Sequence, residues 1–137
     1  MSAVGVDRVF LDANVLFSAA YRPDAGLRWL WQRRRTKLLT SKYALEEAMV
    51  NLPEPAHRRR LTGLMESVTL VRESADEPLP ADVELPLKDR PMLTAALRAD
   101  ASHLVTGDLT HFGPYLGRSV QGMRILTPTA LLGRRRR

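Results

Sequence analysis

The sequence predicts an α/β domain in which helices cover both faces of a mostly parallel sheet. Short apolar runs that suit buried strands alternate with stretches of helical periodicity, and turn residues separate the two. The length of 137 residues and the hydrophobic content of 45% suit one domain with one core. No repeat or linker interrupts residues 1–133, which we expect to form that domain ahead of a basic tail at residues 134–137.

The first half of the chain is predicted to contain three strands and four helices. Each strand is a short apolar run, and capping residues or prolines bound the helices. In order, we expect a strand at 9–11, a helix at 14–20, a helix capped by Asp24 and running through Arg34, a strand at 37–40, a helix capped by Ser41, a helix at 56–67 and a strand at 68–71.

The second half is predicted to begin with a loop, because residues 73–87 contain three prolines and several acidic residues. Pro91 suits the first turn of a strongly apolar helix at 92–101. Strands at 103–106 and 124–126 follow, and Pro128 opens a short final helix.

Two acidic residues fall where a parallel sheet forms its ligand crevice. Asp12 ends the first predicted strand, and Asp108 follows the strand at 103–106. Ligands of such sheets bind outside the carboxyl ends of the strands, near the switch in strand order. We therefore expect the two carboxylates to lie close together, where they repel each other unless a cation intervenes.

Each acidic residue taken alone has a structural explanation. Asp12 and Asp89 precede predicted helices and suit N-caps, whereas Asp108 suits a turn. Glu46 and Glu47 suit a solvent-facing helix surface, because the apolar stripe of their helix includes neither. A set of carboxylates around one crevice is nevertheless costly without a metal, and Mg²⁺ and Mn²⁺ take oxygen ligands. The joint pattern predicts a divalent metal centre and phosphodiester chemistry.

Three segments resemble the signature motifs of PIN-domain nucleases. VFLDANVLFSA resembles their opening strand and helix, and SKYALEEAMVNL resembles the helix that carries an essential glutamate. LKDRPMLTAALRADASHLVTGDLTHFG resembles the remaining signature. The resemblance covers most of the chain in the right order, and it extends to the VapC-like toxins of bacterial toxin–antitoxin pairs. It implies a three-layer α/β/α fold of the PIN type.

The same resemblance implies which residues form the site. Family spacing from Ser41 favours Glu47 over Glu46, a choice that the helical periodicity alone leaves open. The implied metal ligands and catalytic residues, for Mg²⁺ or Mn²⁺, are Asp12, Glu47, Asp89 and Asp108.

Three further residues are predicted to support the site. Asn14 and Thr106 are expected to orient carboxylates or metal-bound water through hydrogen bonds. His111 departs from the pattern, since many relatives carry an acid or an asparagine there. We expect its imidazole either to contact a phosphate or a water molecule, or to be a surface histidine.

The resemblance thus implies a metal-dependent endoribonuclease, the toxin of a toxin–antitoxin pair, with RNA as its substrate. One alternative is a PIN-like module that binds RNA or a protein without cutting. A phosphotransfer enzyme with Asp12 as nucleophile is a further alternative, but that class usually has a second aspartate where this chain has Asn14. The lack of cysteine excludes disulfides and thiolate metal sites and suits the cytoplasm. No apolar run approaches the roughly 20 residues that span a bilayer.

The net charge of +6 makes a polyanionic partner plausible. Four of these charges come from residues 134–137, a run that either contacts substrate or is a solvated tail. Without this run the chain has 17 basic and 15 acidic residues, so the domain itself is only mildly basic. We expect RNA contacts from Arg33, Arg34, Arg58 and Arg59, and base stacking from Trp29, Trp31 and Tyr115.

Apolar side chains on the early helices predict self-association as a homodimer, or binding of an antitoxin. These side chains are Phe17, Tyr21, Leu27, Trp29 and Leu30.

Overall fold

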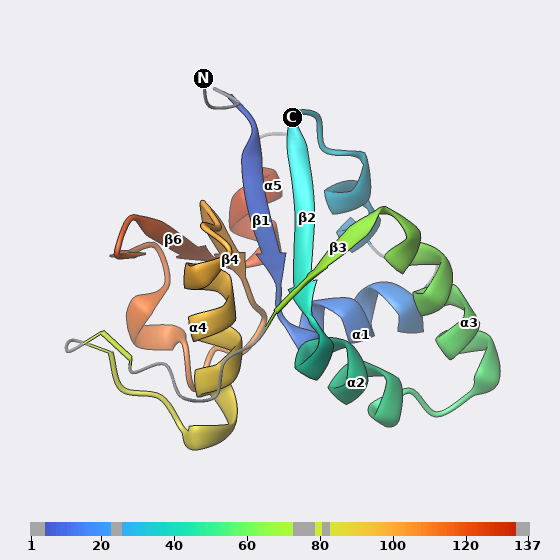
Figure 1. Ribbon diagram of the computed structural model, residues 1–137. Helices are drawn as coiled ribbons and strands as arrows, with labels where there is room; N and C mark the ends of the chain where they lie inside the picture. Colours follow the sequence, from blue (N-terminus) through green and yellow to red (C-terminus); the bar gives the residue numbers. More distant parts are fainter. Residues whose placement is uncertain (1–4, 23–25, 73–78, 81–82, 134–137) are drawn as a thin grey trace.

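A six-stranded sheet forms the centre of the computed structural model, which describes residues 5–22, 26–72, 79–80 and 83–133 (Figure 1). The strand order is β3-β2-β1-β4-β6-β5, and all neighbours are parallel except β5 and β6. The strands are β1 (Asp7–Leu11), β2 (Thr36–Ser41), β3 (Val68–Val71), β4 (His103–Val105), β5 (Ser119–Val120) and β6 (Met123–Leu126).

Helices occupy both sides of this sheet (Figure 1). The α-helices are α1 (Ala13–Tyr21), α2 (Lys42–Asn51), α3 (Pro55–Leu64), α4 (Arg90–Arg98) and α5 (Pro128–Leu132). Short 3-10 helices connect them: η1 (Gly26–Gln32), η2 (Met65–Ser67), η3 (Leu87–Asp89) and η4 (Gly113–Tyr115).

Two hydrophobic cores form because successive residues of a strand point to opposite faces of the sheet. Val9 and Leu11 of β1 belong to the core that α1, α2 and α3 cover. Phe10, between them, belongs to the other core with Leu93 of α4 and Ile125 of β6. All three β1 residues are fully buried. The predicted three-layer α/β/α fold with a mostly parallel sheet is therefore confirmed.

Most predicted elements are present, with boundaries shifted by one to a few residues. Ser41 caps α2 as expected, since its hydroxyl accepts a hydrogen bond from the Ala44 amide at 3.1 Å. The predicted helix at 56–67 is α3 followed by η2, and the strand at 124–126 is the end of β6. The predicted loop at 73–87 and the tail at 134–137 lie partly and wholly outside the described residues.

The predicted helix through Arg34 is wrong in type and extent. The segment is the 3-10 helix η1, which ends at Gln32, and its proposed cap Asp24 lies outside the described residues. Trp31 fixes η1 to the helical layer, because its ring Nε1 donates a hydrogen bond to the Leu64 carbonyl at 2.9 Å. Arg35 has a φ of 51°, a left-handed conformation that turns the chain into β2.

The antiparallel hairpin of β5 and β6 was not predicted. Gln121 and Gly122 connect the strands with φ values of 50° and 86°, the pair of positive angles that a tight hairpin turn requires. Gln-Gly is a weaker turn signal than Asn-Gly, and β5 contains only two residues. Within the described part of the chain, no helix is both long and apolar enough to span a bilayer.

Candidate active site

The carboxyl ends of β1 and β4 meet at the point where the strand order reverses. From β1 the chain adds β2 and then β3 on one side, whereas β4 pairs with the other side of β1. The arrowheads of β1 and β2 point to the edge of the sheet where α1 and α2 begin (Figure 1). A pocket of about 290 Å³ lies at this edge, lined by Asp12, Ala13, Asn14, Phe17, Ser18, Tyr43, Ala44, Glu47, Ala48, Asn51, Asp89, Met92 and Asp108.

Asp12 joins the start of α1 to the end of β4. Its carboxylate accepts hydrogen bonds from the Ala13 amide at 2.6 Å and from the Thr106 hydroxyl at 2.7 Å. A third donor, the side-chain amide of Asn14, lies 3.0 Å away. Asp12 is therefore the N-cap of α1, which was its structural explanation in the sequence, and its carboxylate also lines the pocket.

Asp12 is only 7% exposed, and this burial raises the pKa of its carboxyl group to about 6. The negative charge of Asp89 raises the pKa further, whereas the hydrogen bonds from Thr106, Ala13 and Asn14 lower it. The effect of burial on the pKa outweighs that of the three hydrogen bonds. The Asp12 carboxylate is thus held in a position where a bound cation would stabilise it.

Asn14 and Gly107 bring the loop after β4 against α1. The Asn14 side-chain oxygen accepts a hydrogen bond from the Gly107 amide at 2.7 Å, which fixes the orientation of the Asn14 amide group. A Cβ atom on Gly107 would lie 3.2 Å from that oxygen, so a larger residue would require the Asn14 side chain to shift by a few tenths of an ångström. Gly107 therefore allows a close approach of the loop after β4 to Asn14.

Thr106 positions Asp108 as well as Asp12. The Thr106 hydroxyl donates to Asp12 and accepts a hydrogen bond from the Asp108 amide at 3.0 Å. Asp108 Oδ1 in turn accepts from the amides of Thr110 and His111, at 3.1 and 2.9 Å. The turn that the sequence suggested for Asp108 is present, and it engages only one of the two carboxylate oxygens.

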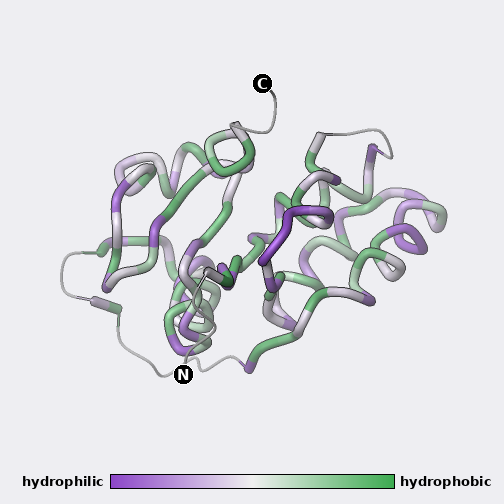
Figure 2. The backbone as a smooth tube through the Cα atoms, turned by 90° about the horizontal axis from the view of Figure 1, so that it is seen from above, coloured by the Kyte–Doolittle hydropathy of each residue, from purple (hydrophilic) through white to green (hydrophobic). Residues whose placement is uncertain are grey.

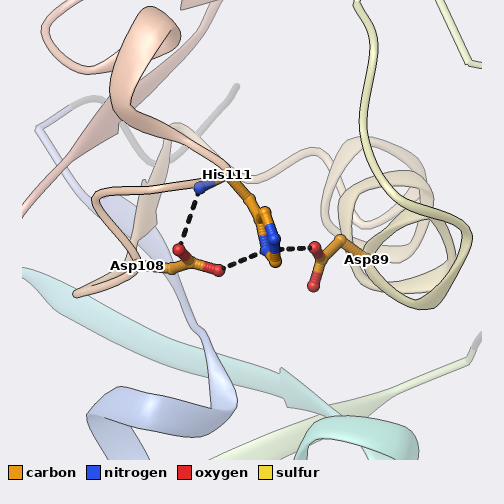
Figure 3. Close-up of side chains that lie close together, drawn as sticks. All are labelled: Asp89, Asp108 and His111. Carbon is orange, nitrogen blue, oxygen red and sulfur yellow. Dashed lines mark hydrogen bonds and ion pairs between the residues drawn. The ribbon is translucent and has the colours of Figure 1, made fainter.

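The second oxygen of Asp108 faces His111, as Figure 3 shows. The distance from His111 Nδ1 to Asp108 Oδ2 is 2.8 Å, and the distance to Asp89 Oδ2 is 3.0 Å. The three side chains are 15–29% exposed. Asp89 makes no side-chain capping hydrogen bond to α4, so capping does not explain its position. The surface-histidine interpretation of His111 is incomplete, because the ring bridges two carboxylates of the site.

Glu47 lines the pocket and Glu46 does not. Glu46 lies 3.9 Å from Lys42 in an exposed ion pair on α2. Tyr43 and Asn51, four residues before and after Glu47, share its side of the helix and also line the pocket. The sequence did not lead us to predict Tyr43 and Asn51 as pocket residues. Their spacing of four residues from Glu47 on the same helix could have indicated them.

The pocket suits a hard divalent cation. Four carboxylates line it, and no lysine or arginine belongs to its described lining. Oxygen ligands of this kind are those that Mg²⁺ and Mn²⁺ prefer. The pKa of Asp12, raised by burial and by the charge of Asp89, indicates that the protein itself does not fully compensate the charge of Asp12.

The predicted RNA-binding arginines lie away from the pocket lining. Arg33 and Arg34 precede β2, at the amino edge of the sheet. Figure 2 views the chain from this edge, and the stretch that leads into β2 is hydrophilic there. Arg33 forms an ion pair with Asp7 at 2.8 Å. On α3, Arg58 donates to the Leu52 carbonyl at 2.6 Å, and Arg59 is exposed. Their contact with RNA stays a prediction.

The aromatic and apolar residues singled out in the sequence separate into two groups. Trp31 and Tyr115 form hydrogen bonds within the fold. The ring of Trp31 donates to the Leu64 carbonyl, and the Tyr115 hydroxyl donates to the Glu84 carbonyl at 3.2 Å. Leu30 is buried in the first core and contributes no surface, contrary to expectation. Tyr21 and Trp29 are 44% and 49% exposed.

The comparison with known families agrees with the geometry. No curated protein matches the chain. The model of the PIN domain matches residues 8–110, about three quarters of the sequence, from β1 to the loop that carries Asp108. The chain therefore belongs to the PIN domain family.

Proposed function

We propose that this PIN domain is a metal-dependent endoribonuclease that hydrolyses phosphodiester bonds in RNA. The observation that carries the proposal is the convergence of Asp12, Glu47, Asp89 and Asp108 on one pocket at the strand-order switch. PIN domains are generally metal-dependent nucleases. The choice of RNA rests on the resemblance of the three sequence segments to PIN-type toxin ribonucleases.

The carboxylates of Asp12, Asp89 and Asp108 would hold Mg²⁺ or Mn²⁺, with Glu47 completing the site. The bound ion would supply a water molecule of lowered pKa and would neutralise charge on the scissile phosphate. Thr106 and Asn14 hold the Asp12 carboxylate in a fixed orientation through hydrogen bonds. We assign Glu47, the most exposed of the four acids, to positioning the attacking water and accepting its proton.

Two aromatic side chains of the pocket favour a single-stranded substrate. Phe17 and Tyr43 line the pocket beside the carboxylates. Unpaired bases stack on aromatic rings, whereas bases within a duplex are not available for such stacking. We therefore place the bases next to the scissile phosphate against these two rings.

The decisive experiment compares wild type with Asp108→Asn on single-stranded RNA. Asparagine keeps the oxygen that accepts from Thr110 and His111, so the turn survives while one ligand charge disappears. Cleavage with Mg²⁺ or Mn²⁺ should stop in EDTA and fall at least about 100-fold in the variant. Glu66→Gln, an exposed residue of η2, is the matched control and should retain activity.

Cleavage that is unchanged in Asp108→Asn would refute the assigned site. An absence of cleavage on RNA and DNA, with metal binding retained, would instead favour the alternative of a PIN module that binds without cutting. A protein that cleaves only DNA would overturn the substrate assignment and leave the metal centre in place.

We also propose that the protein is the toxin of a toxin–antitoxin pair and forms homodimers. Tyr21 and Trp29, both about half exposed, support an apolar contact surface next to α1. Phe17 and Tyr21 stack at 5.4 Å, which extends that surface towards the pocket. Sedimentation as a monomer at high micromolar concentration would refute the homodimer. The toxin assignment would be refuted if the protein encoded by a neighbouring short reading frame failed to inhibit RNA cleavage.

A further inference from the structure

Asp89 and Asp108, which line the pocket, form a mixed oxygen and nitrogen cluster with His111 (Figure 3). One potential ligand atom from each side chain lies within 4.8 Å of the other two. Asp89 ends η3, whereas Asp108 and His111 lie in the loop after β4. The family match ends at residue 110, one residue before His111.

His111 is fixed in place by its neighbours on both sides. Its amide donates to Asp108 Oδ1 at 2.9 Å, and the next residue, Phe112, is fully buried in the second core. The Phe112 amide donates to the Asp108 carbonyl at 3.2 Å. The imidazole is therefore presented to the two carboxylates by a rigid turn.

The distances from His111 Nδ1 to the two carboxylate oxygens match the spacing of neighbouring ligands around one ion. Ligands at about 2.1 Å from an octahedral metal are about 3.0 Å apart when they are adjacent. The distances from His111 Nδ1 to the two carboxylate oxygens are 2.8 and 3.0 Å. Nδ1 is also buried and makes no hydrogen bond of acceptable geometry within the described part of the chain.

We propose that His111 Nδ1 is a nitrogen ligand of the divalent ion, together with Asp89 and Asp108, and that it makes the centre prefer first-row transition ions over Mg²⁺. Imidazole suits Fe²⁺, Ni²⁺, Cu²⁺ and Zn²⁺, whereas Mg²⁺ prefers a shell of oxygen atoms. The inference rests on the proposed function only in placing the ion at this pocket. It adds a ligand and a metal preference to that proposal.

Pulsed electron paramagnetic resonance of Mn²⁺ bound to the untagged full chain tests the nitrogen ligand directly. The chain contains three histidines, His57, His103 and His111, so the other two provide matched controls. We expect a coupling of Mn²⁺ to a directly bound ¹⁴N nucleus in wild type, His57→Asn and His103→Asn, and its loss in His111→Asn.

Competition between Ni²⁺ and Mg²⁺ tests the metal preference with a second variant. His111→Asp replaces the nitrogen by oxygen, so it should still bind Mg²⁺ while its ratio of Ni²⁺ to Mg²⁺ affinity falls by about tenfold. Circular dichroism melting verifies that both variants fold. The imidazole is 29% exposed and the turn uses its backbone amide, so we expect both to do so.

The outcomes separate this inference from the nuclease proposal. Nitrogen coupling that persists in His111→Asn, a spectrum without such coupling in wild type, or an unchanged affinity ratio in His111→Asp would overturn the ligand assignment. RNA cleavage is measured independently, so a metal centre with a His111 ligand and no cleavage would refute the nuclease proposal and leave this inference standing.

Discussion

Asp12 combines a structural role with a place in the proposed metal centre. Its carboxylate accepts hydrogen bonds from α1 and from Thr106 at the end of β4, so it holds two segments 94 residues apart in sequence. The same carboxylate is buried next to the charge of Asp89. Substitution of Asp12 therefore changes both the packing of α1 and the metal centre, whereas substitution of Asp108 leaves the turn intact.

The pKa of Asp12 predicts how the stability of the metal-free protein depends on pH. The pKa is 3.8 in the unfolded chain and about 6 in the folded protein, so between these values the folded state binds more protons. The free energy of unfolding should therefore fall as pH rises through this window, by about 1 kcal/mol from pH 5 to pH 7. Urea unfolding in EDTA at several pH values measures this decrease.

Two controls isolate the contribution of Asp12. The variant Asp12→Asn cannot titrate at this position, so the decrease between pH 5 and pH 7 should be smaller than in wild type. Saturating Mn²⁺ should oppose the decrease, because metal ligands bind in the deprotonated form. An identical pH dependence in wild type and Asp12→Asn would show that the Asp12 carboxyl is not the titrating group.

At the scale of the element, α2 presents different residues on neighbouring sides. Ala44 and Ala48 face the core, Glu47 lines the pocket with Tyr43 and Asn51, and Glu46 faces solvent. The rotation of about 100° per residue separates two adjacent glutamates of the same chemistry. The pair is therefore an internal control for the assigned site.

We expect Glu47→Gln to reduce RNA cleavage by about 100-fold or more, because the proposed proton acceptor and ligand charge are lost. Glu46→Gln should cleave RNA within about twofold of wild type, since only an exposed ion pair with Lys42 is removed. Single-turnover rates at saturating Mn²⁺ provide the comparison. Equal losses in both variants, or a larger loss in Glu46→Gln, would remove Glu47 from the site.

The elements that could be predicted from the sequence are those with strong local signals. The apolar run of β1, the Ser41 cap and the helix after Pro91 all appear at or near their predicted positions. The pairing of Gln121 with Gly122 in a hairpin turn depends on positive φ angles that a sequence signals only weakly. The type of η1 depends on tertiary packing of Trp31, which no local pattern encodes.

The sequence could predict which acidic residues gather at this pocket but not how their side chains are arranged. Asp12 and Asp108 could be placed at strand ends, and family resemblance added Glu47 and Asp89. The position of His111 between Asp89 and Asp108 depends on how the loop after β4 returns to α4, which separate sequence segments do not reveal. Arg33 pairs with Asp7 for the same reason, since register between β1 and β2 brings the two residues together.

At the scale of the whole molecule, the pocket carboxylates and the arginines before β2 lie at opposite edges of the sheet. Four carboxylates line the pocket at the carboxyl edge of the sheet, whereas Arg33 and Arg34 precede β2 at the amino edge. A polyanion that reaches this pocket meets negative charge unless a cation is bound. Metal binding is therefore expected to control both the stability of the folded chain and its affinity for RNA.

Mn²⁺ should raise the melting temperature of the wild type at constant ionic strength. An ion that binds the folded state and not the unfolded chain stabilises it by about 2.7 kcal/mol at one hundred times its dissociation constant. Without metal, Asp108→Asn should melt no lower than wild type, because a repelling charge is removed while Oδ1 still accepts from Thr110 and His111. The shift caused by Mn²⁺ should shrink in this variant, and Glu66→Gln should respond as wild type does. If Asp108 has only a structural role, Asp108→Asn should melt well below wild type in EDTA, and Mn²⁺ should change the melting temperature of neither protein. That result would mean that the carboxylates stabilise turns and helix ends, and it would refute the metal centre.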